Sequence, residues 1–265
     1  MIDIHHHLLF GLDDGPVDIE TSLEMIEMAV RDGITHIVCT PHANARWAFN
    51  PAINRQKLDE LNLRMKSKVT LGLGCDFHLS YDNIEDALNN RDKYTINGKQ
   101  YLLVEFADLM IPTSLNDSFY EMLVAGLQPI ITHPERNFTI QKHPERMKEW
   151  LRGGCLVQVT AASLTGRFGR TAQAMAMQFL EKDWVHFLAT DAHSLQGRPP
   201  ILREAYEIVA KRFGKDTAER LCVENPRAAF YGEELSQQPE PQGIEAEDEA
   251  KGRQRKGLLG RLFSG

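Results

Sequence analysis

Histidine and carboxylate side chains recur along this chain where apolar segments end. The first group is His5-His6-His7, which follows an isoleucine-rich opening. Successive side chains of an extended strand alternate between its faces, so His5 and His7 point one way and His6 the other. Asp14 stands on the loop that follows, beyond a Gly and Asp break. Two imidazoles and one nearby carboxylate suit a divalent cation.

The same residue types return at the ends of later apolar runs. A single strand-end histidine is more often structural than a ligand, and a lone buried carboxylate is costly unless it is paired or bound to metal. Six of the seven expected strands nonetheless carry such a residue, and this recurrence predicts a shared site. The candidate metal ligands are His5, His7, Asp14, His42, Asp76, Glu105, His133, Asp191 and His193.

The elements that must position these side chains are seven apolar segments of strand length, which alternate with helical patterns. Continuous apolar runs are typical of parallel strands buried on both faces, and the alternation predicts right-handed βαβ crossovers. Barrels built in this way gather their sites at the C-terminal ends of the strands. Beyond the opening segment, the expected strands cover residues 34–40, 69–76, 101–106, 128–133, 155–160 and 185–190.

Composition narrows the class of protein. The chain has 265 residues, 42% of them hydrophobic and 25% charged, as expected for a soluble globular protein. The sequence has no apolar run of membrane-spanning length and no N-terminal signal pattern, so a cytoplasmic location is expected. The net charge of −7 argues against a nucleic-acid partner bound through a basic face.

The composition changes after Gly232. Residues 1–232 are expected to form one catalytic domain, and residues 233–265 a separate tail. Glu, Gln, Pro and Gly dominate 233–250, which is typical of a disordered acidic linker. The chain then ends in a basic and apolar stretch, 251–263. This stretch is either an amphipathic helix that contacts an anionic membrane or a disordered end.

The number of candidate ligands predicts more than one metal ion. Zinc takes about four ligands, so nine histidines and carboxylates suit three divalent ions with bridging carboxylates. Three such ions carry +6 and the carboxylates of Asp14, Asp76, Glu105 and Asp191 carry −4. The remaining +2 would balance a phosphate dianion or a hydroxide.

Four motifs carry a family resemblance. They are H-x-H at residues 5–7, T-P-H at 40–42, H-P-E-R at 133–136, and D-A-H at 191–193 followed by G-R-P-P at 197–200. In order and spacing, residues 1–232 resemble the polymerase and histidinol phosphatase (PHP) superfamily. More narrowly, they resemble the bacterial manganese-dependent protein-tyrosine phosphatases of capsular and exopolysaccharide synthesis.

The resemblance implies an α/β fold, a distorted seven-stranded (β/α)7 TIM-like PHP barrel, with three metal ions. Mn²⁺ is the implied metal, and Fe²⁺ or Zn²⁺ are the alternatives. Arg136 and Arg198 would bind phosphate, which suits the planar guanidinium group. The implied ligand sets are His5, His7, Asp76 and Asp191 for the first ion; Asp76, Glu105 and His133 for the second; and Asp14, His42 and His193 for the third.

One ligand position departs from the family pattern. The family has Glu in a G-x-E motif where this chain has Gly74-Cys75-Asp76. The Asp side chain is shorter by one methylene group. The bridge between the first two ions is therefore expected to be altered, or one of the two sites weakened.

The implied activity is hydrolysis of phosphotyrosine on a protein, a tyrosine kinase of capsule or exopolysaccharide synthesis. One alternative is another PHP activity, as a small-molecule phosphatase such as histidinol phosphatase or as a nuclease. Another is a non-catalytic, metal-binding partner of the kinase. Arg198 in its G-R-P-P context favours the tyrosine phosphatase.

The cysteines exclude the common thiolate mechanism. Cysteine-dependent tyrosine phosphatases need a C-x5-R loop around the phosphate. None of Cys39, Cys75, Cys155 and Cys222 begins such a loop, and no C-x-x-C pair indicates a zinc knuckle. The sequence therefore favours metal-dependent hydrolysis.

Overall fold

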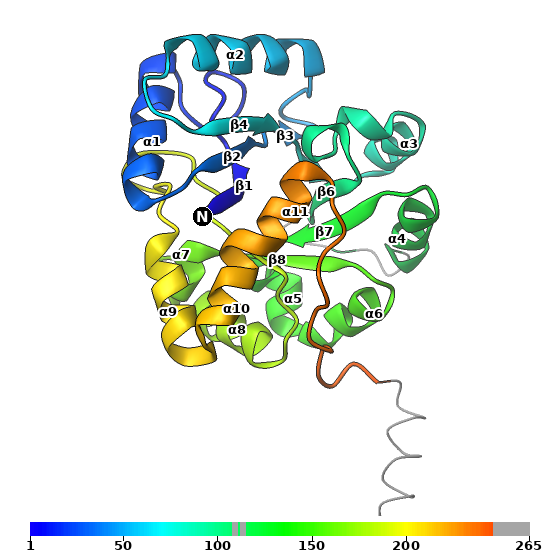
Figure 1. The fold of residues 1–265 in the computed structure, drawn as a ribbon. Helices are drawn as coiled ribbons and strands as arrows, with labels where there is room; N and C mark the ends of the chain where they lie inside the picture. The colour runs from blue at the N-terminus through cyan, green and yellow to red at the C-terminus, as the bar shows by residue number, and fades with distance from the viewer. Residues whose placement is uncertain (108–110, 112–114, 246–265) are drawn as a thin grey trace, which may run out of the picture.

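The computed structural model describes residues 1–107, 111 and 115–245, and shows a mixed α/β fold with parallel strands (Figure 1). The strands are β1 (Ile2–His6), β2 (His36–Cys39), β3 (His42–Ala43), β4 (Thr70–Leu73), β5 (Asp76–His78), β6 (Tyr101–Glu105), β7 (Gln128–Thr132), β8 (Leu156–Thr160) and β9 (Phe187–Ala189). The α-helices are α1 (Ile19–Asp32), α2 (Pro51–Arg64), α3 (Tyr81–Asn89), α4 (Leu115–Val124), α5 (Phe138–Lys142), α6 (Met147–Arg152), α7 (Ala161–Leu164), α8 (Gly169–Glu181), α9 (Arg203–Phe213), α10 (Lys215–Glu219) and α11 (Asn225–Tyr231). Four 3₁₀ turns and one π-helical turn complete the described elements: η1 (Arg91–Lys93), η2 (Ile96–Gly98), η3 (Pro134–Arg136), η4 (Pro144–Arg146) and the π turn η5 (Arg220–Glu224).

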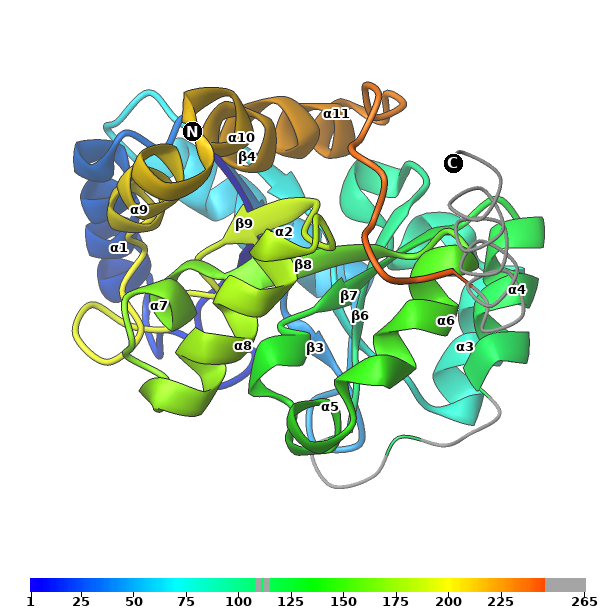
Figure 2. The ribbon, with the colours of Figure 1, turned by 90° about the horizontal axis from the view of Figure 1, so that it is seen from below.

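The strands form two sheets in which every pair is parallel. The smaller sheet has the order β1-β2-β4, and the larger has the order β3-β5-β6-β7-β8-β9. Helices follow most strands and lie outside the sheets (Figures 1 and 2). All strands therefore direct their C-terminal ends toward the same side.

Two of the expected strands are each broken into two. The segment expected at 34–40 continues to residue 43 but is interrupted at Thr40-Pro41, and the segment expected at 69–76 is interrupted at Gly74-Cys75. Pro41 has no amide hydrogen, so the regular ladder cannot continue through it. The amide of Gly74 donates to Cys39 O at 2.9 Å and the amide of Asp76 donates to Pro41 O at 3.1 Å, so hydrogen bonds still span the break.

The outermost strands of the two sheets also meet. His6 and Ala192 form an isolated parallel bridge just past the end of β9. The amide of Asp191 donates to His5 O at 2.8 Å, and the amide of His7 donates to Ala192 O at 2.9 Å. These bonds bring the C-terminal end of β1 beside the residues that follow β9.

Strand side chains alternate between two hydrophobic clusters. On β6, Leu103 belongs to an inner cluster, whereas Leu102 and Val104 belong to an outer cluster that packs against the surrounding helices. Ala229 and Phe230 of α11 join the inner cluster, and α11 crosses the N-terminal side of the strands (Figure 1). Helix α11 thus covers one end of the interior, and the polar site lies at the other end.

The segment after α11 has no helix or strand up to residue 245, but it contacts the domain. The Tyr101 hydroxyl donates to Glu233 O at 2.7 Å, and Trp184 Nε1 donates to Gln242 O at 2.9 Å. Arg152 Nε donates to Ile244 O. Residues 246–265, which include the basic and apolar stretch of the expected tail, lie outside the described residues.

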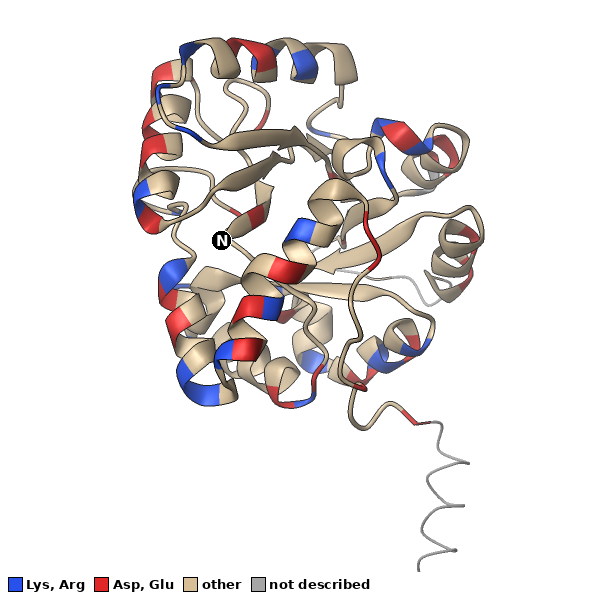
Figure 3. Ribbon diagram, in the orientation of Figure 1, with Lys and Arg blue, Asp and Glu red and all other residues tan. Residues whose placement is uncertain are grey.

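Charged residues of both signs occupy the outer helices, such as α1, α2 and α9 (Figure 3). Among the described residues, no helix combines the length and the apolar character needed to cross a bilayer.

Candidate metal centre

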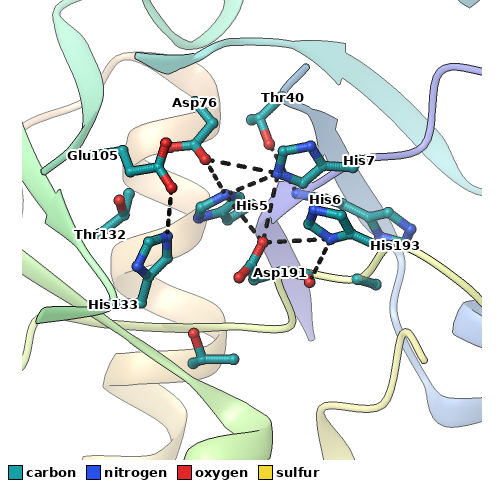
Figure 4. Close-up of polar contacts among 12 residues, drawn as sticks. His5, His6, His7, Thr40, Asp76, Glu105, Thr132, His133, Asp191 and His193 are labelled. Carbon is teal, nitrogen blue, oxygen red and sulfur yellow. Dashed lines mark hydrogen bonds and ion pairs between the residues drawn. The ribbon is translucent and has the colours of Figure 1, made fainter. Parts of the chain in front are cut away.

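The nine predicted ligands converge at the C-terminal side of the strands. Figure 4 shows those among them that surround His5, namely His7, Asp76, Glu105, His133, Asp191 and His193. His5 lies on β1, His42 begins β3, Asp76 begins β5 and Glu105 ends β6. The loops just past a strand end carry His7, His133, Asp191 and His193, and Asp14 lies further along the loop that follows β1. The breaks at Pro41 and Gly74 set the start of β3 and β5, so the irregular part of the sheet delivers His42 and Asp76.

Four groups of these residues place ligand atoms within 4.8 Å of one another. They are His7, Asp14, His42 and His193; His5, His7 and Asp76; His5, His133 and Asp191; and His42, Asp76 and Glu105. These four groups share more residues with one another than the three ligand sets implied by the resemblance do. His7 joins the Asp14 set, and His133 groups with His5 and Asp191, although its Nε2 is also 3.8 Å from Glu105 Oε1.

The chemistry of these groups fits bound cations. Both side-chain oxygens of Asp76, Asp191 Oδ1, His42 Nδ1 and His193 Nε2 are buried without a hydrogen-bond partner. Unsatisfied buried polar atoms are rare in folded proteins and call for an ion or water. His5 Nε2 and His7 Nε2 face each other at 3.3 Å, with Asp76 and Asp191 oxygens 3.4–3.8 Å away.

The pKa values of neighbouring imidazoles diverge strongly within this site. Burial lowers the pKa of His5, but the carboxylates of Asp191 and Asp76 outweigh it and raise that pKa to about 9. Burial and the nearby His193 lower the pKa of His7 to about 3. A positive charge is therefore favoured on the His5 ring and disfavoured on the His7 ring. Divalent cations among the carboxylates would satisfy both imidazoles as neutral ligands.

Outer hydrogen bonds orient three of the imidazoles. His7 Nδ1 lies 2.8 Å from Asp13 Oδ2, and His5 Nδ1 lies 3.0 Å from Gln158 Oε1. His193 Nδ1 lies 2.9 Å from Asp191 O. If each Nδ1 carries the proton, each Nε2 is left free as a ligand atom, which is the usual arrangement at metal-binding histidines.

The sequence reasoning did not identify Asp13 and Gln158. Asp13 is next to the predicted ligand Asp14, and the sequence alone does not distinguish the roles of the two carboxylates. Gln158 is the polar residue within the apolar strand β8, the one expected strand without a candidate ligand. The signal available in the sequence was a Gln inside the apolar run Leu156-Val157-Gln158-Val159, and in the structure this Gln is fully buried.

Two site residues have left-handed backbones. His133 has φ 35° and Asp191 has φ 51°, whereas only two other described non-glycine residues have positive φ, Asn97 and Asp183. This conformation is unfavourable for side-chain-bearing residues and is concentrated at functional sites. It turns the chain sharply where β7 and β9 end, which directs both side chains into the centre.

The two predicted phosphate-binding arginines lie beside this centre. Arg136 is on η3 and Arg198 is on the loop after β9, and both are partly buried. Arg136 Nη1 and Arg198 Nη2 both donate to Asp191 Oδ2. The structure thus brings both guanidinium groups to the edge of the candidate metal centre.

Three further rings border the site. The His6 ring faces away from the centre, as strand alternation predicts, and its Nδ1 lies 3.2 Å from Asp3 Oδ2. His78 Nδ1 is 3.9 Å from Glu105 Oε2. The Trp47 ring stacks on His42 with centroids 5.0 Å apart and planes 10° apart, a contact that the sequence did not predict.

Residues 1–231 match the family model for capsular polysaccharide synthesis proteins CpsB/CapC. The chain is 34% identical to the tyrosine-protein phosphatase YwqE of Bacillus subtilis, over 92% of this chain and 96% of that protein. It is 32% identical to the tyrosine-protein phosphatase CpsB of Streptococcus pneumoniae, over 86% of this chain and 97% of that protein.

Solved structures agree with these relationships. A crystal structure from work on YwqE of B. subtilis and CpsB of S. pneumoniae, described as metal-dependent tyrosine phosphatases, superposes with a TM-score of 0.86 at 33% identity. It covers 93% of this chain and all of that chain. A β-aspartyl dipeptidase of Fervidobacterium islandicum, at 15% identity and TM-score 0.52, shares the fold alone. The chain therefore belongs to the CpsB/CapC family of capsular polysaccharide synthesis proteins.

Proposed function

We propose that this protein is a metal-dependent protein-tyrosine phosphatase whose substrate is a phosphotyrosine protein, a tyrosine kinase of capsule or exopolysaccharide synthesis. The observation that carries the proposal is the convergence of buried histidine and carboxylate groups with two arginines at one edge. A cation cluster beside two guanidinium groups is suited to a phosphate dianion. The names of the family relatives support the same activity.

The metal ligands in this proposal are the nine predicted residues, holding three divalent ions, with Mn²⁺ the first choice and Fe²⁺ or Zn²⁺ the alternatives. His5, His7, Asp76 and Asp191 would hold the first ion; Asp76, Glu105 and His133 the second; and Asp14, His42 and His193 the third. Bound divalent ions would supply an activated water molecule and neutralise the charge of the phosphate. The overlapping ligand groups and the unpartnered buried atoms support this assignment.

The protein's own side chains would bind and orient the substrate. Arg136 and Arg198 would donate to phosphate oxygens, with their planar N–H groups matched to two oxygens each. Asp13 and Gln158 would keep His7 and His5 in the tautomer that leaves Nε2 free. The tyrosyl leaving group has a pKa near ~10, so it departs with less help from a general acid than an alkoxide does.

The two sheets are proposed to be parts of one distorted seven-stranded barrel. The hydrogen bonds across the Pro41 and Gly74 breaks join the small sheet to the large one on one side. The His6 to Ala192 bridge joins them on the other side. Counted through its breaks, the proposed barrel would have seven strands, the number expected from the sequence.

Residues 1–232 are proposed as the catalytic domain, and 233–265 as a linker and tail that contacts an anionic membrane surface from the cytoplasmic side. A chain ending at residue 245 keeps the contacts of Gln242 and Ile244 with the domain. It should retain turnover of a phosphotyrosine peptide and lose binding to vesicles that contain anionic lipid. Equal vesicle binding by the full and shortened chains would reject the membrane contact.

The proposed activity is tested with metal-stripped protein. Mn²⁺, Fe²⁺, Zn²⁺ or Mg²⁺ is added back, and release of phosphate is measured from a phosphotyrosine peptide, a phosphoserine peptide and histidinol phosphate. We expect metal-dependent turnover with preference for phosphotyrosine. Preference for histidinol phosphate would favour the small-molecule phosphatase, and tight peptide binding without turnover would favour the non-catalytic partner.

A further inference from the structure

The Phe168 ring lies against both arginines of the proposed phosphate clamp. The guanidinium carbon of Arg136 is 4.2 Å from the ring centroid, and that of Arg198 is 5.9 Å from it. Among the described aromatic rings, this one alone has such a contact with two cations. A cation near the face of an aromatic ring is attracted by its negative quadrupole.

The backbone around Phe168 is anchored to the element that carries Arg136. The buried carboxylate of Glu135 accepts hydrogen bonds from the Thr160 amide at 3.0 Å and from Ser163 Oγ at 2.7 Å. These bonds tie the end of β8 and the start of α7 to η3. The Phe168 segment and Arg136 are therefore held in fixed positions relative to each other.

The turn that presents Phe168 depends on glycine. Gly166 has φ +82° and Gly169 has φ +87°, both in the left-handed region, and they flank Arg167 and Phe168. This geometry projects the Phe168 ring from a tight turn at the start of α8. The ring is partly buried, and within the described part of the chain it belongs to neither hydrophobic cluster. Its arginine contacts, rather than core packing, account for its position.

The two arginines need a support other than Asp191. Both guanidinium groups donate to the same oxygen, Asp191 Oδ2, and like charges this close repel each other. Asp191 is also a proposed metal ligand, so a bound cation would compete for its negative charge. The face of Phe168 offers both guanidinium groups an attraction that a metal ion does not withdraw.

We propose that Phe168 is a positioning residue that holds Arg136 and Arg198 in the orientation that binds phosphate. The inference rests on the proposed role of these arginines in the phosphatase site. It assigns a function to a residue outside the ligand and clamp motifs. It predicts that the aromatic face, and not merely apolar volume, is required at position 168.

The test compares Phe168→Leu with Phe168→Tyr in the Mn²⁺-loaded protein. Binding of inorganic phosphate is measured by calorimetry, and KM and kcat are measured with a phosphotyrosine peptide. Phe168→Leu should weaken phosphate binding about fivefold to twentyfold and raise KM by a similar factor, as expected from one or two cation–π contacts. Phe168→Tyr keeps the ring face and should stay within about twofold of the wild type on the same reasoning.

Phe213→Leu is the matched control, because the Arg212 guanidinium carbon lies 5.6 Å from the Phe213 ring at the end of α9, remote from the site. It should leave phosphate binding unchanged. Metal content and melting temperature are measured on all variants. A Phe168→Leu protein that loses metal or melts much earlier would show a structural role and overturn the inference.

A second measurement separates action through the arginines from a general effect. The Phe168→Leu change is repeated in an Arg136→Ala background, where its effect on phosphate affinity should shrink to about half or less, because the nearer of its two partners is gone. The inference would be overturned if the effects of the two substitutions on phosphate affinity were fully additive. It would also be overturned if Phe168→Leu left the affinity unchanged, or if the wild type did not bind phosphate. Phosphate binding without phosphotyrosine turnover would instead reject the proposed function and leave the role of Phe168 supported.

Discussion

Asp76 is the residue on which the candidate metal centre depends most. Its two buried oxygens have no hydrogen-bond partner, and Oδ2 lies 3.5 Å from His5 Nε2 and 3.1 Å from His42 Nδ1. Asp76 belongs both to the group with His5 and His7 and to the group with Glu105, so its carboxylate is placed to bridge two cations. The Asp side chain is shorter by one methylene group than the Glu that the resemblance leads us to expect, but it still reaches both groups.

Replacing Asp76 should therefore change metal content and activity together. Asp76→Ala should lose at least one bound ion and most activity, because a bridging carboxylate is removed, whereas Asp76→Glu should keep or raise both. Elemental analysis of the purified variants, alongside phosphotyrosine turnover, makes the comparison. Full metal occupancy with full activity in the Ala variant would remove Asp76 from the site.

The cysteines predict a second outcome at the level of single residues. All four are buried, and burial raises the pKa of the Cys155 thiol to about 12. At pH 8 the Cys155 thiol therefore stays protonated, so native protein should resist iodoacetamide. Replacing each cysteine by serine or alanine should preserve turnover if the variant folds, while a chelator abolishes it. Chelator-resistant activity that disappears with one cysteine would contradict the metal mechanism.

The candidate ligands could be selected from the sequence because most of them lie at or just beyond the end of an apolar strand. The alternation of side chains along a strand also predicted correctly that His6 points away from the site, whereas His5 and His7 point into it. Asp13 and Trp47 were not predictable in the same way, because their contacts with His7 and His42 depend on the path of irregular loops. No periodicity in a sequence fixes such a path.

At the scale of elements, the order of strands and helices followed from the apolar pattern, whereas the division into two sheets did not. The run from Ile34 to Thr40 contains the apolar stretch Ile37-Val38-Cys39 near its end, so its pattern gives no reason for a break there. The break comes from Pro41 and from a matching interruption at Gly74 on the neighbouring strand. A Cβ atom on Gly74 would come within 3.0 Å of Val38 Cγ1, which shows how closely the two segments approach there.

His186, which precedes β9, links strand packing to pH. Its Nδ1 accepts a hydrogen bond from the Val157 amide at 3.2 Å, which requires an unprotonated nitrogen. Burial, reinforced by Arg220, lowers the pKa of His186 to about 4. The unfolded chain binds this proton near its ordinary pKa of 6.5, so acid favours unfolding.

We expect the titration of His186 to lower the free energy of unfolding by about 3 kcal/mol as the pH falls from 6.5 to 4. Above pH 6.5 this titration should not change the stability. His186→Asn keeps an acceptor for Val157 and removes the titration, so its stability should fall less over that range. Urea unfolding of both proteins, with chelator present, gives the difference, and His143→Asn at an exposed site is the control. Parallel pH curves for wild type and His186→Asn would contradict the role of His186.

At the scale of the whole molecule, the interior is divided between apolar and polar ends. The inner cluster, closed by Phe230 of α11, fills the N-terminal part of the strands, and buried ligands fill the C-terminal part. The apolar part is complete by itself. The polar part leaves carboxylate oxygens and imidazole nitrogens without hydrogen-bond partners. Cations bound among these atoms should therefore stabilise the folded state.

Metal removal should therefore lower the melting temperature as well as abolish activity. A free metal concentration of 1,000 times Kd stabilises a folded protein by about 4 kcal/mol, which corresponds to roughly 10 °C for a domain of this size. Calorimetry of metal-stripped protein with and without Mn²⁺ measures the shift. The paired variant His5→Ala/His7→Ala should show a smaller Mn²⁺ shift than the wild type, because two ligands of the first proposed ion are gone while those of the other two ions remain. An equal Mn²⁺ shift in this variant would place the stabilising ion elsewhere on the molecule, and the absence of any shift in the wild type would contradict a metal-completed interior.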